Sequence, residues 1–268
     1  MSSSDPAFSG SIPELYERLM VPMLFEPYAR DLARRAREVA PASVLELAAG
    51  TGVVTRQLAE VLSPDAAIVA TDLSQAMLDE AASREIARPV EWVAADAMSL
   101  PFADASFDLV VCQFGVMFFP DKPTAFAEAR RVLRPGGSLL FNVWDEVAAN
   151  DFVAVVQAAL AEFFPEDPPS FMAELPHGYH SADRIRRDLE LGGFTRPVAI
   201  ETRPDESRAS SAEAAAIAYC QANPNRLQIE RRGSLDAATR HVTAALTARF
   251  GSGPIKGRMQ ALVVSTTR

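Results

Sequence analysis

An acidic residue and two glycines lie close together near the start of the chain, in a pattern suited to binding a small polar molecule. Glu46 lies in the apolar run Val44–Leu47, and Gly50 and Gly52 follow within six residues. Because glycine has no Cβ, this turn can adopt backbone angles closed to other residues, and a ligand can lie against its peptide groups. An acid inside an apolar strand needs a polar partner, so Glu46 is a candidate for the same site.

A second acid follows this turn after twenty residues. Asp72 stands in the sequence Thr71-Asp72-Leu73-Ser74, directly after an apolar stretch. In α/β folds that bind nucleosides, an acid at this spacing accepts hydrogen bonds from ribose hydroxyls. Asp72 is also suited to cap a helix, but Ser74 can do so in its place. We therefore expect a nucleoside site, in which Leu73 and Met77 pack on the base.

Alternating strand and helix segments must position these residues. The pattern predicts strands at 44–47, 67–71, 90–95, 107–113 and 138–143, with helices at 53–62, 75–88 and 124–133 and a turn at 134–137. Such alternation is typical of parallel strands joined by right-handed crossovers. Ligands of these sheets lie beyond the carboxyl ends of the strands, where Gly50, Asp72 and a third acid, Asp96, all fall.

The flanking segments are mostly helical. Residues 12–40 predict two helices, with Pro22 and Pro27 breaking the run. Further on, the pattern predicts helices at 152–164 and 182–191, the second capped by Ser181, and strands at 196–202 and 259–266. Residues 203–258 separate these last two strands and look helical at 211–222 and 235–250. An insertion of this length is usually functional, so we expect a substrate cap.

Composition narrows the class of protein. The chain has 268 residues, 49% hydrophobic and 23% charged, with no apolar run of about 20 residues, so we expect a globular protein without a membrane span. Residues 1–10 lack the pattern of a secretory signal, which predicts a cytoplasmic location. Two cysteines, Cys112 and Cys220, are expected to be packing residues, and no metal site is expected. The net charge of −9 disfavours a nucleic-acid partner.

The order and spacing of these motifs resemble class I S-adenosylmethionine-dependent methyltransferases, in particular the small-molecule enzymes of the ubiquinone/menaquinone biosynthesis type. The resemblance covers about residues 42–143 and lies in segments 45–52, 71–77, 96–97, 107–108 and 133–137. Ala48 stands where the family has its first glycine and is small enough for the turn. The resemblance implies a Rossmann-like, seven-stranded, mostly parallel sheet with helices on both faces and a helical cap inserted between the last two strands.

The resemblance also implies roles for individual residues. Glu46 would hold the amino group of S-adenosylmethionine, Asp96 would accept from the adenine amine, and Gln113 would approach the methionine half. The expected cofactor-binding set is Glu46, Ala48, Gly50, Thr51, Gly52, Asp72, Leu73, Met77, Asp96, Ala97, Met98, Gln113 and Phe114. Phe8 and Tyr16 would close over the pocket, although packing of the N-terminal helices against the core is the more usual role of such aromatic residues.

The acceptor side is less defined by the sequence. Phe118 would wall the acceptor, whereas Met117 and Phe119 are more typical of packing. His180, just before a predicted helix, is the best candidate for a base among three histidines, although a surface role is also open. The implied organisation is an arm at 1–40 covering the site, a core at 41–202 and 259–268, and the cap at 203–258.

The implied reaction is in-line transfer of a methyl group from S-adenosylmethionine to a small-molecule acceptor, with S-adenosylhomocysteine as product. We expect a monomer or a homodimer. One alternative is a catalytically silent domain that binds the cofactor as a sensor or partner subunit. A nicotinamide-dependent oxidoreductase is the other alternative, but Thr55 replaces the third glycine of the dinucleotide turn and no Tyr-x-x-x-Lys pair is present.

Overall fold

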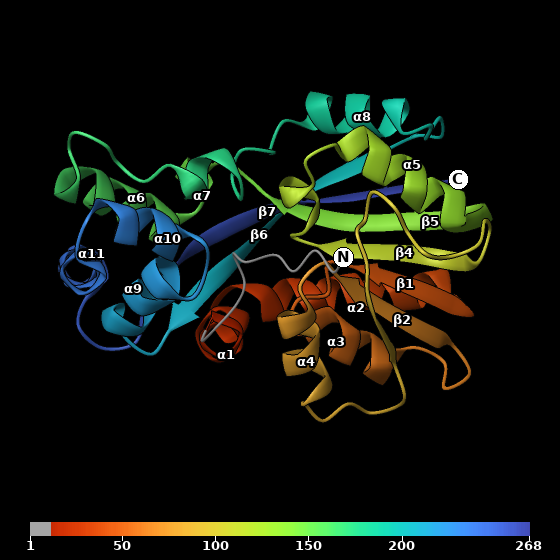
Figure 1. Cartoon of the computed structure of the whole chain (residues 1–268), viewed down its shortest axis with the longest axis horizontal. Helices are drawn as coiled ribbons and strands as arrows, with labels where there is room; N and C mark the ends of the chain where they lie inside the picture. Colours follow the sequence, from red (N-terminus) through yellow and green to blue (C-terminus); the bar gives the residue numbers. More distant parts are fainter. Residues whose placement is uncertain (1–11) are drawn as a thin grey trace.

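A single seven-stranded sheet forms the centre of the computed structural model, which describes residues 12–268 (Figure 1). Its order is β3-β2-β1-β4-β5-β7-β6. The strands are β1 (Ser43–Leu47), β2 (Ala67–Asp72), β3 (Glu91–Ala94), β4 (Phe107–Gln113), β5 (Leu133–Trp144), β6 (Ala199–Ala209) and β7 (Ile255–Thr267). Strands β1 to β5 pair in parallel, and β7 runs antiparallel to both of its neighbours. The predicted Rossmann-like, mostly parallel sheet is confirmed.

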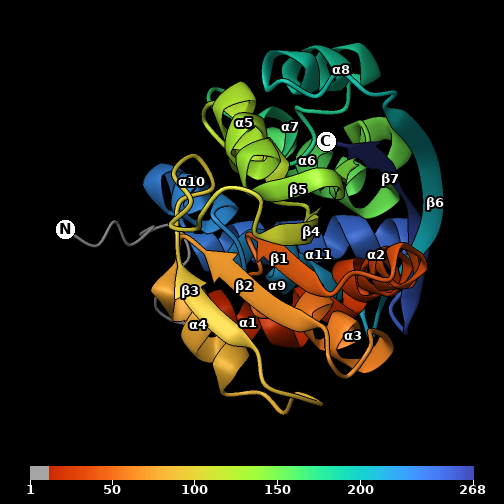
Figure 2. The ribbon, with the colours of Figure 1, turned by 90° about the vertical axis from the view of Figure 1, so that its right-hand side faces the viewer.

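Helices cover both faces of this sheet. One face carries α2 (Glu26–Val39), α3 (Val53–Val61) and α4 (Gln75–Ala82), and the other carries α5 (Lys122–Val132) and α8 (Ala182–Leu191). Figure 2 shows β3 and β6 at opposite edges, with these two helix layers on either side. Central strand residues such as Val110 and Val111 are fully buried between the layers, as expected for parallel strands. No helix in residues 12–268 is long and apolar enough to cross a bilayer.

A second group of helices packs around the end of the β6–β7 hairpin at which β6 finishes and β7 begins (Figure 1). It contains α6 (Asp151–Phe163), α7 (Phe171–Glu174), α9 (Ala212–Gln221), α10 (Asn225–Arg232) and α11 (Leu235–Phe250). Helix α11 packs against both α6 and α9. The last three helices come from the segment between β6 and β7, where the sequence predicts helices at 211–222 and 235–250 but not α10.

The N-terminal arm is one continuous helical path, so the prediction that Pro22 and Pro27 break it is wrong. A short α1 (Ile12–Leu15) leads into a π-helical segment, η2 (Tyr16–Phe25), and then directly into α2. Pro27 lies in the first turn of α2. N–H groups in the first turn of a helix have no acceptor within that helix, so a proline there costs no hydrogen bond. The wider π-helical turns accommodate Pro22 within η2. The arm packs against both α4 and α9 and so joins the sheet to the second helix group.

The closing hairpin is longer than the sequence predicts. Strand β6 begins at Ala199 and continues to Ala209, and its pairing with β7 extends to Ile255. The charged run from Arg203 to Arg208 obscures this strand in the sequence. Pro204 is tolerated because β6 is an edge strand and needs hydrogen bonds on one side only. The helical insertion is therefore shorter than 203–258.

Two further boundaries differ from the sequence prediction. The helix expected to reach residue 88 ends at Ala82, where the Ser83 hydroxyl donates back to the Glu80 carbonyl at 2.8 Å. The turn expected at 134–137 is an irregular part of β5, because the pairing of β4 with β5 shifts register there. Gly136 adopts a φ of 81° at this point, which glycine allows at little cost.

Candidate active site

The glycine turn connects β1 to α3 and has the left-handed backbone that the sequence predicts. Gly50 has a φ of 56° and Gly52 a φ of 80°. A Cβ at Gly52 would lie 3.0 Å from the Trp92 ring, so glycine is needed there for space as well as for conformation. Ala48 also has a positive φ, 52°, which costs a residue with a Cβ about 1–2 kcal/mol. The turn therefore stores backbone strain at the position where the family has glycine.

Asp72 lies at the carboxyl end of β2 and supports this turn directly. One carboxylate oxygen accepts from the Gly50 N–H at 2.8 Å, and the other accepts from the Ser74 N–H at 2.8 Å. Ser74 caps α4, as expected, with its side chain accepting from Met77. A carboxylate has about four acceptor positions, enough to hold these two N–H groups and also to accept from two ribose hydroxyls.

A cleft of about 380 Å³ opens along the carboxyl ends of the strands. Its volume falls in the range of small-molecule sites. The predicted residues that line it are Tyr16, Ala48, Gly50, Asp72, Leu73, Met77, Asp96, Ala97, Met98, Gln113, Phe114 and Phe118. Three other members of the expected cofactor set, Glu46, Thr51 and Gly52, do not line it. Phe8, expected to close over the same pocket, lies outside the described residues.

Glu46 lies behind the glycine turn, away from the cleft. It is 1% exposed, and the Thr55 hydroxyl donates to its carboxylate at 2.6 Å. Burial raises the pKa of Glu46 to about 8, and the hydrogen bond from Thr55 opposes this shift. The expectation that Glu46 reaches the amino group of a ligand therefore does not fit this geometry, in which the buried carboxyl anchors α3 to β1.

The third and fourth strands supply the rest of the cleft. Asp96 lines the cleft, and its carboxylate accepts from the Met98 N–H at 2.8 Å. This hydrogen bond stabilises the turn at 96–98 that follows β3. Gln113 donates through its amide to the Phe25 carbonyl at 3.3 Å. Its side-chain oxygen is buried and has no partner within residues 12–268. Because that oxygen is fully enclosed, a ligand in the cleft meets other atoms of Gln113 and not this acceptor.

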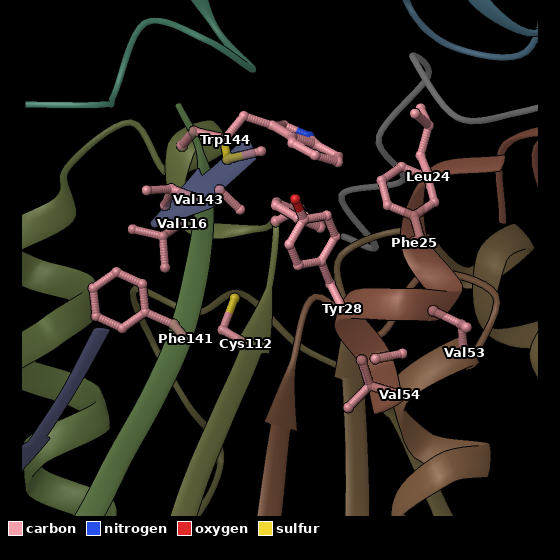
Figure 3. Close-up of a cluster of buried hydrophobic side chains, with 14 of the residues drawn as sticks. Leu24, Phe25, Tyr28, Val53, Val54, Cys112, Val116, Phe141, Val143 and Trp144 are labelled. Atoms are coloured by element: carbon pink, nitrogen blue, oxygen red, sulfur yellow. The ribbon is translucent and has the colours of Figure 1, made fainter. Parts of the chain in front are cut away.

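Phe114, at the end of β4, forms part of an aromatic cluster above the sheet. It has a φ of 51°, and its ring stacks on Trp144 with centroids 3.8 Å apart and planes 6° from parallel. Figure 3 shows Phe25, Tyr28 and Trp144 facing one another in this cluster. Tyr28 meets Trp144 edge-on, with centroids 5.4 Å apart. The strained backbone of Phe114 is thus held by packing on several sides.

A second, smaller cavity of about 60 Å³ adjoins the cleft. Tyr16, Phe114 and Phe118 line both. Its wall is mostly aromatic and methionine side chains from the arm, from the segment that follows β4, from the end of β5, from the segment around α7 and from the insertion. Within residues 12–268, the lining residues are Tyr16, Met20, Leu24, Phe25, Phe114, Met117, Phe118, Trp144, Asn150, Phe171, Met172, Pro176, His177, Tyr219, Asn223 and Pro224. None of these carries a net charge at neutral pH with histidine neutral.

The histidine in this cavity differs from the predicted one. His180 is exposed and lines neither cavity, whereas His177 is buried and lines the aromatic cavity. The three-residue offset turns His180 outward, where its ring meets the His177 carbonyl at 2.7 Å. Sequence reasoning also missed Trp144 and Tyr219. Trp144 directly follows the fifth predicted strand, at the edge where ligands bind, and this position could have identified it.

An ion pair fastens the arm over the glycine turn. The Arg56 guanidinium donates to the Glu17 carboxylate at 2.6 Å and to the Thr51 carbonyl at 2.7 Å. Because Glu17 follows Tyr16 directly, this ion pair holds Tyr16, which lines both cavities, close to the glycine turn.

Comparison with known proteins agrees with this site. Residues 45–141 match the family described as "Methyltransferase domain". The chain is 32% identical over 175 residues to demethylmenaquinone methyltransferase of Corynebacterium urealyticum, a match that covers 62% of this chain and 73% of that protein. It is 40% identical over 166 residues to ubiquinone/menaquinone biosynthesis C-methyltransferase UbiE of Stutzerimonas stutzeri, covering 57% of this chain and 65% of that one.

Among solved structures, phosphoethanolamine N-methyltransferase 2 of Haemonchus contortus in complex with S-adenosyl-L-methionine has a similar fold. The TM-score is 0.61 at 17% identity, over 98% of this chain and 58% of that one. The fold and the cleft define a class I S-adenosylmethionine-dependent methyltransferase. Within that class, the chain belongs to the family of the ubiquinone/menaquinone biosynthesis methyltransferases. This membership overturns the alternative of a nicotinamide-dependent oxidoreductase.

Proposed function

We propose that this enzyme methylates a small, neutral, largely apolar acceptor that binds in the aromatic cavity. The observation that carries the proposal is that the cavity adjoins the cofactor-sized cleft, since Tyr16, Phe114 and Phe118 line both. Among residues 12–268, no Asp, Glu, Lys or Arg lines the cavity, so a charged acceptor would lose its hydration without gaining a partner there. Quinol rings are the first class to test, since two relatives are named for quinone biosynthesis.

The cleft residues fit S-adenosylmethionine. Asp72 would accept from the ribose hydroxyls, Asp96 would face the adenine, and Gln113 would approach the methionine half beside Phe114. When bound, the cofactor supplies an electrophilic methyl group that an acceptor displaces in line. The protein's contribution is to hold the acceptor at the junction of the two cavities and to exclude water from it.

We propose that the arm and the insertion form the lid of the acceptor site. The arm contributes Met20 and Phe25 to the cavity wall, and the insertion contributes Tyr219 and Pro224. A cavity of about 60 Å³ is well below the usual size of ligand sites, so an acceptor enters only when these segments move apart. Methionines in the wall can then adapt to the shape of the acceptor.

The alternative of a silent cofactor-binding domain predicts no pocket beside the methyl group, and the aromatic cavity counts against it. The test is an activity screen with S-adenosylmethionine labelled in its methyl group, over quinols, phenols, amines and carboxylates of similar size. We expect label transfer to the neutral rings and little to the charged compounds. Transfer only to charged acceptors, or no transfer by a protein that binds S-adenosylhomocysteine, would contradict the proposal.

A further inference from the structure

Apart from Tyr16, the polar side chains in the wall of the aromatic cavity fall into two sets. The first set is already paired within the protein. The side-chain oxygen of Asn150 accepts from the Gln260 N–H at 2.9 Å, and that of Asn223 accepts from the Asn225 N–H at 2.9 Å. Both amide nitrogens donate to backbone carbonyls nearby. These two side chains hold the wall together and leave little capacity for an acceptor.

The second set consists of His177, Tyr219 and Trp144. The Nε2 atom of His177, the hydroxyl of Tyr219 and the indole N–H of Trp144 have no hydrogen-bond partner within residues 12–268. None of the three is among the completely enclosed polar atoms that lack a partner, so each retains contact with open space. All three side chains line the aromatic cavity.

The hydrogen bond at the other ring nitrogen fixes the tautomer of His177. Its Nδ1 lies 2.7 Å from the Asp145 carbonyl oxygen. A carbonyl can only accept, so Nδ1 carries the proton and Nε2 carries a lone pair. The ring also stacks on Trp144, with centroids 5.9 Å apart, and the backbone N–H of His177 donates to the Met172 carbonyl at 3.0 Å. The lone pair is therefore held in one direction.

The environment keeps this lone pair available. His177 is 5% exposed, and burial lowers its pKa to about 4, so the ring is neutral at neutral pH. Asp145, whose carbonyl holds the ring, is itself fixed, because its carboxylate accepts from the Gln260 amide at 2.8 Å. A pinned, neutral imidazole in an apolar cavity is an arrangement typical of a hydrogen-bond acceptor for a ligand.

Resting on the proposed function, we propose that His177 is a catalytic residue: Nε2 accepts a hydrogen bond from a hydroxyl of the neutral acceptor and takes its proton during methyl transfer. In this step the ring carbon beside that hydroxyl bonds to the methyl carbon, the carbon–sulfur bond breaks with its electron pair left on sulfur, and the hydroxyl proton moves to Nε2. The ring carbon then loses its own proton to water, and the oxygen recovers the proton held on Nε2. The hydroxyl becomes strongly acidic as the ring carbon gains the methyl group, because the ring then carries a positive charge, so a weak base is sufficient. The Tyr219 hydroxyl and the Trp144 indole N–H are two further donors in the wall of the same cavity.

A binding experiment tests the hydrogen bond without requiring turnover. The protein is labelled with 15N-histidine and saturated with S-adenosylhomocysteine, and phenol and toluene are added as probes that differ only in hydroxyl against methyl. The His177 signals are assigned by their loss in His177→Gln. We expect phenol to shift the Nε2 resonance by several ppm and toluene to leave it nearly unchanged. An equal response to both probes, or none to phenol, would overturn the proposal.

A kinetic comparison tests the proton transfer, with His180→Gln as the matched control on the surface. For the best hydroxylated acceptor in the screen, His177→Gln should lower kcat/KM at least 100-fold, and His180→Gln should stay within twofold of wild type. Unchanged affinity for S-adenosylhomocysteine shows that both variants are folded. Full activity in His177→Gln would overturn the proposal. If the wild type methylates no compound in the screen, the proposed function fails, and the phenol and toluene comparison still decides the role of His177.

Discussion

Replacing Asp72 tests whether this carboxylate binds the cofactor ribose as well as the glycine turn. Its oxygens hold the N–H groups of Gly50 and Ser74, both at 2.8 Å, in the wall of the 380 Å³ cleft. A hydrogen bond to a charged group contributes about 1.5–3 kcal/mol. Loss of two such bonds to ribose hydroxyls in Asp72→Ala should cost roughly 3–6 kcal/mol of binding, which is about a 100- to 10,000-fold rise in Kd for S-adenosylhomocysteine.

The same substitution also removes support from the turn, and the two effects must be separated. Loss of the acceptor for the Gly50 N–H should lower the free energy of unfolding by about 1–3 kcal/mol, measured by denaturant titration without ligand. Asp72→Asn keeps the size of the side chain but turns an amide NH2 toward an N–H donor, so it should also weaken binding. Asp79→Asn, on the exposed face of α4, is the matched control and should bind as wild type does. Equal Kd values for Asp72→Ala and Asp79→Asn by calorimetry would refute the reasoning.

Three other predictions follow from single contacts. A Cβ at Gly115 would lie 2.5 Å from the Ala48 Cβ, so Gly115→Ala should lower the free energy of unfolding by about 1–3 kcal/mol. Adding Ala48→Gly removes the contact and should restore at least about 0.5 kcal/mol of that loss. Strictly additive effects of the two substitutions in a double-mutant cycle would contradict this prediction. The pKa of Glu46 is about 8 in the folded protein, whereas its ordinary value is 4.5. The folded state therefore binds the Glu46 proton more tightly than the unfolded state does. Stability should therefore fall as pH rises from about 4.5 through about 8, and Glu46→Gln should flatten this slope in denaturant titrations across that range. Glu17→Gln removes the ion pair with Arg56 and should speed S-adenosylhomocysteine dissociation several-fold in stopped flow, whereas an unchanged rate would show that the pair does not hold the arm closed.

The parallel half of the sheet could be predicted because its signals are local. An apolar run followed by a small or an acidic residue marks β1 and β2. A longer apolar run marks β4, and its predicted bounds, Phe107–Gln113, agree with the structure. Strand β6 was harder to delimit, since its charged segment is stabilised by pairing with β7, far away in sequence. The helical path through Pro22 depends on packing of the arm against α9, which no local pattern reveals.

The cofactor side of the site could be predicted for a similar reason. Gly50 and Asp72 belong to consecutive strand ends, so their meeting follows from the topology. The acceptor side could not, because its wall combines five segments that are distant in sequence, at 16–25, 114–118, 144–150, 171–177 and 219–224. His177 and His180 illustrate the limit: three residues separate them, and only the fold decides that the first faces the cavity and the second faces outward.

A crystal structure of the protein with S-adenosylhomocysteine bound tests the central claim most directly. The account predicts the adenosine in the cleft, with its ribose hydroxyls on the Asp72 carboxylate and its sulfur beside Phe114, at the junction with the aromatic cavity. The ligand bound elsewhere, or bound in the cleft with its sulfur directed away from that cavity, would contradict the account.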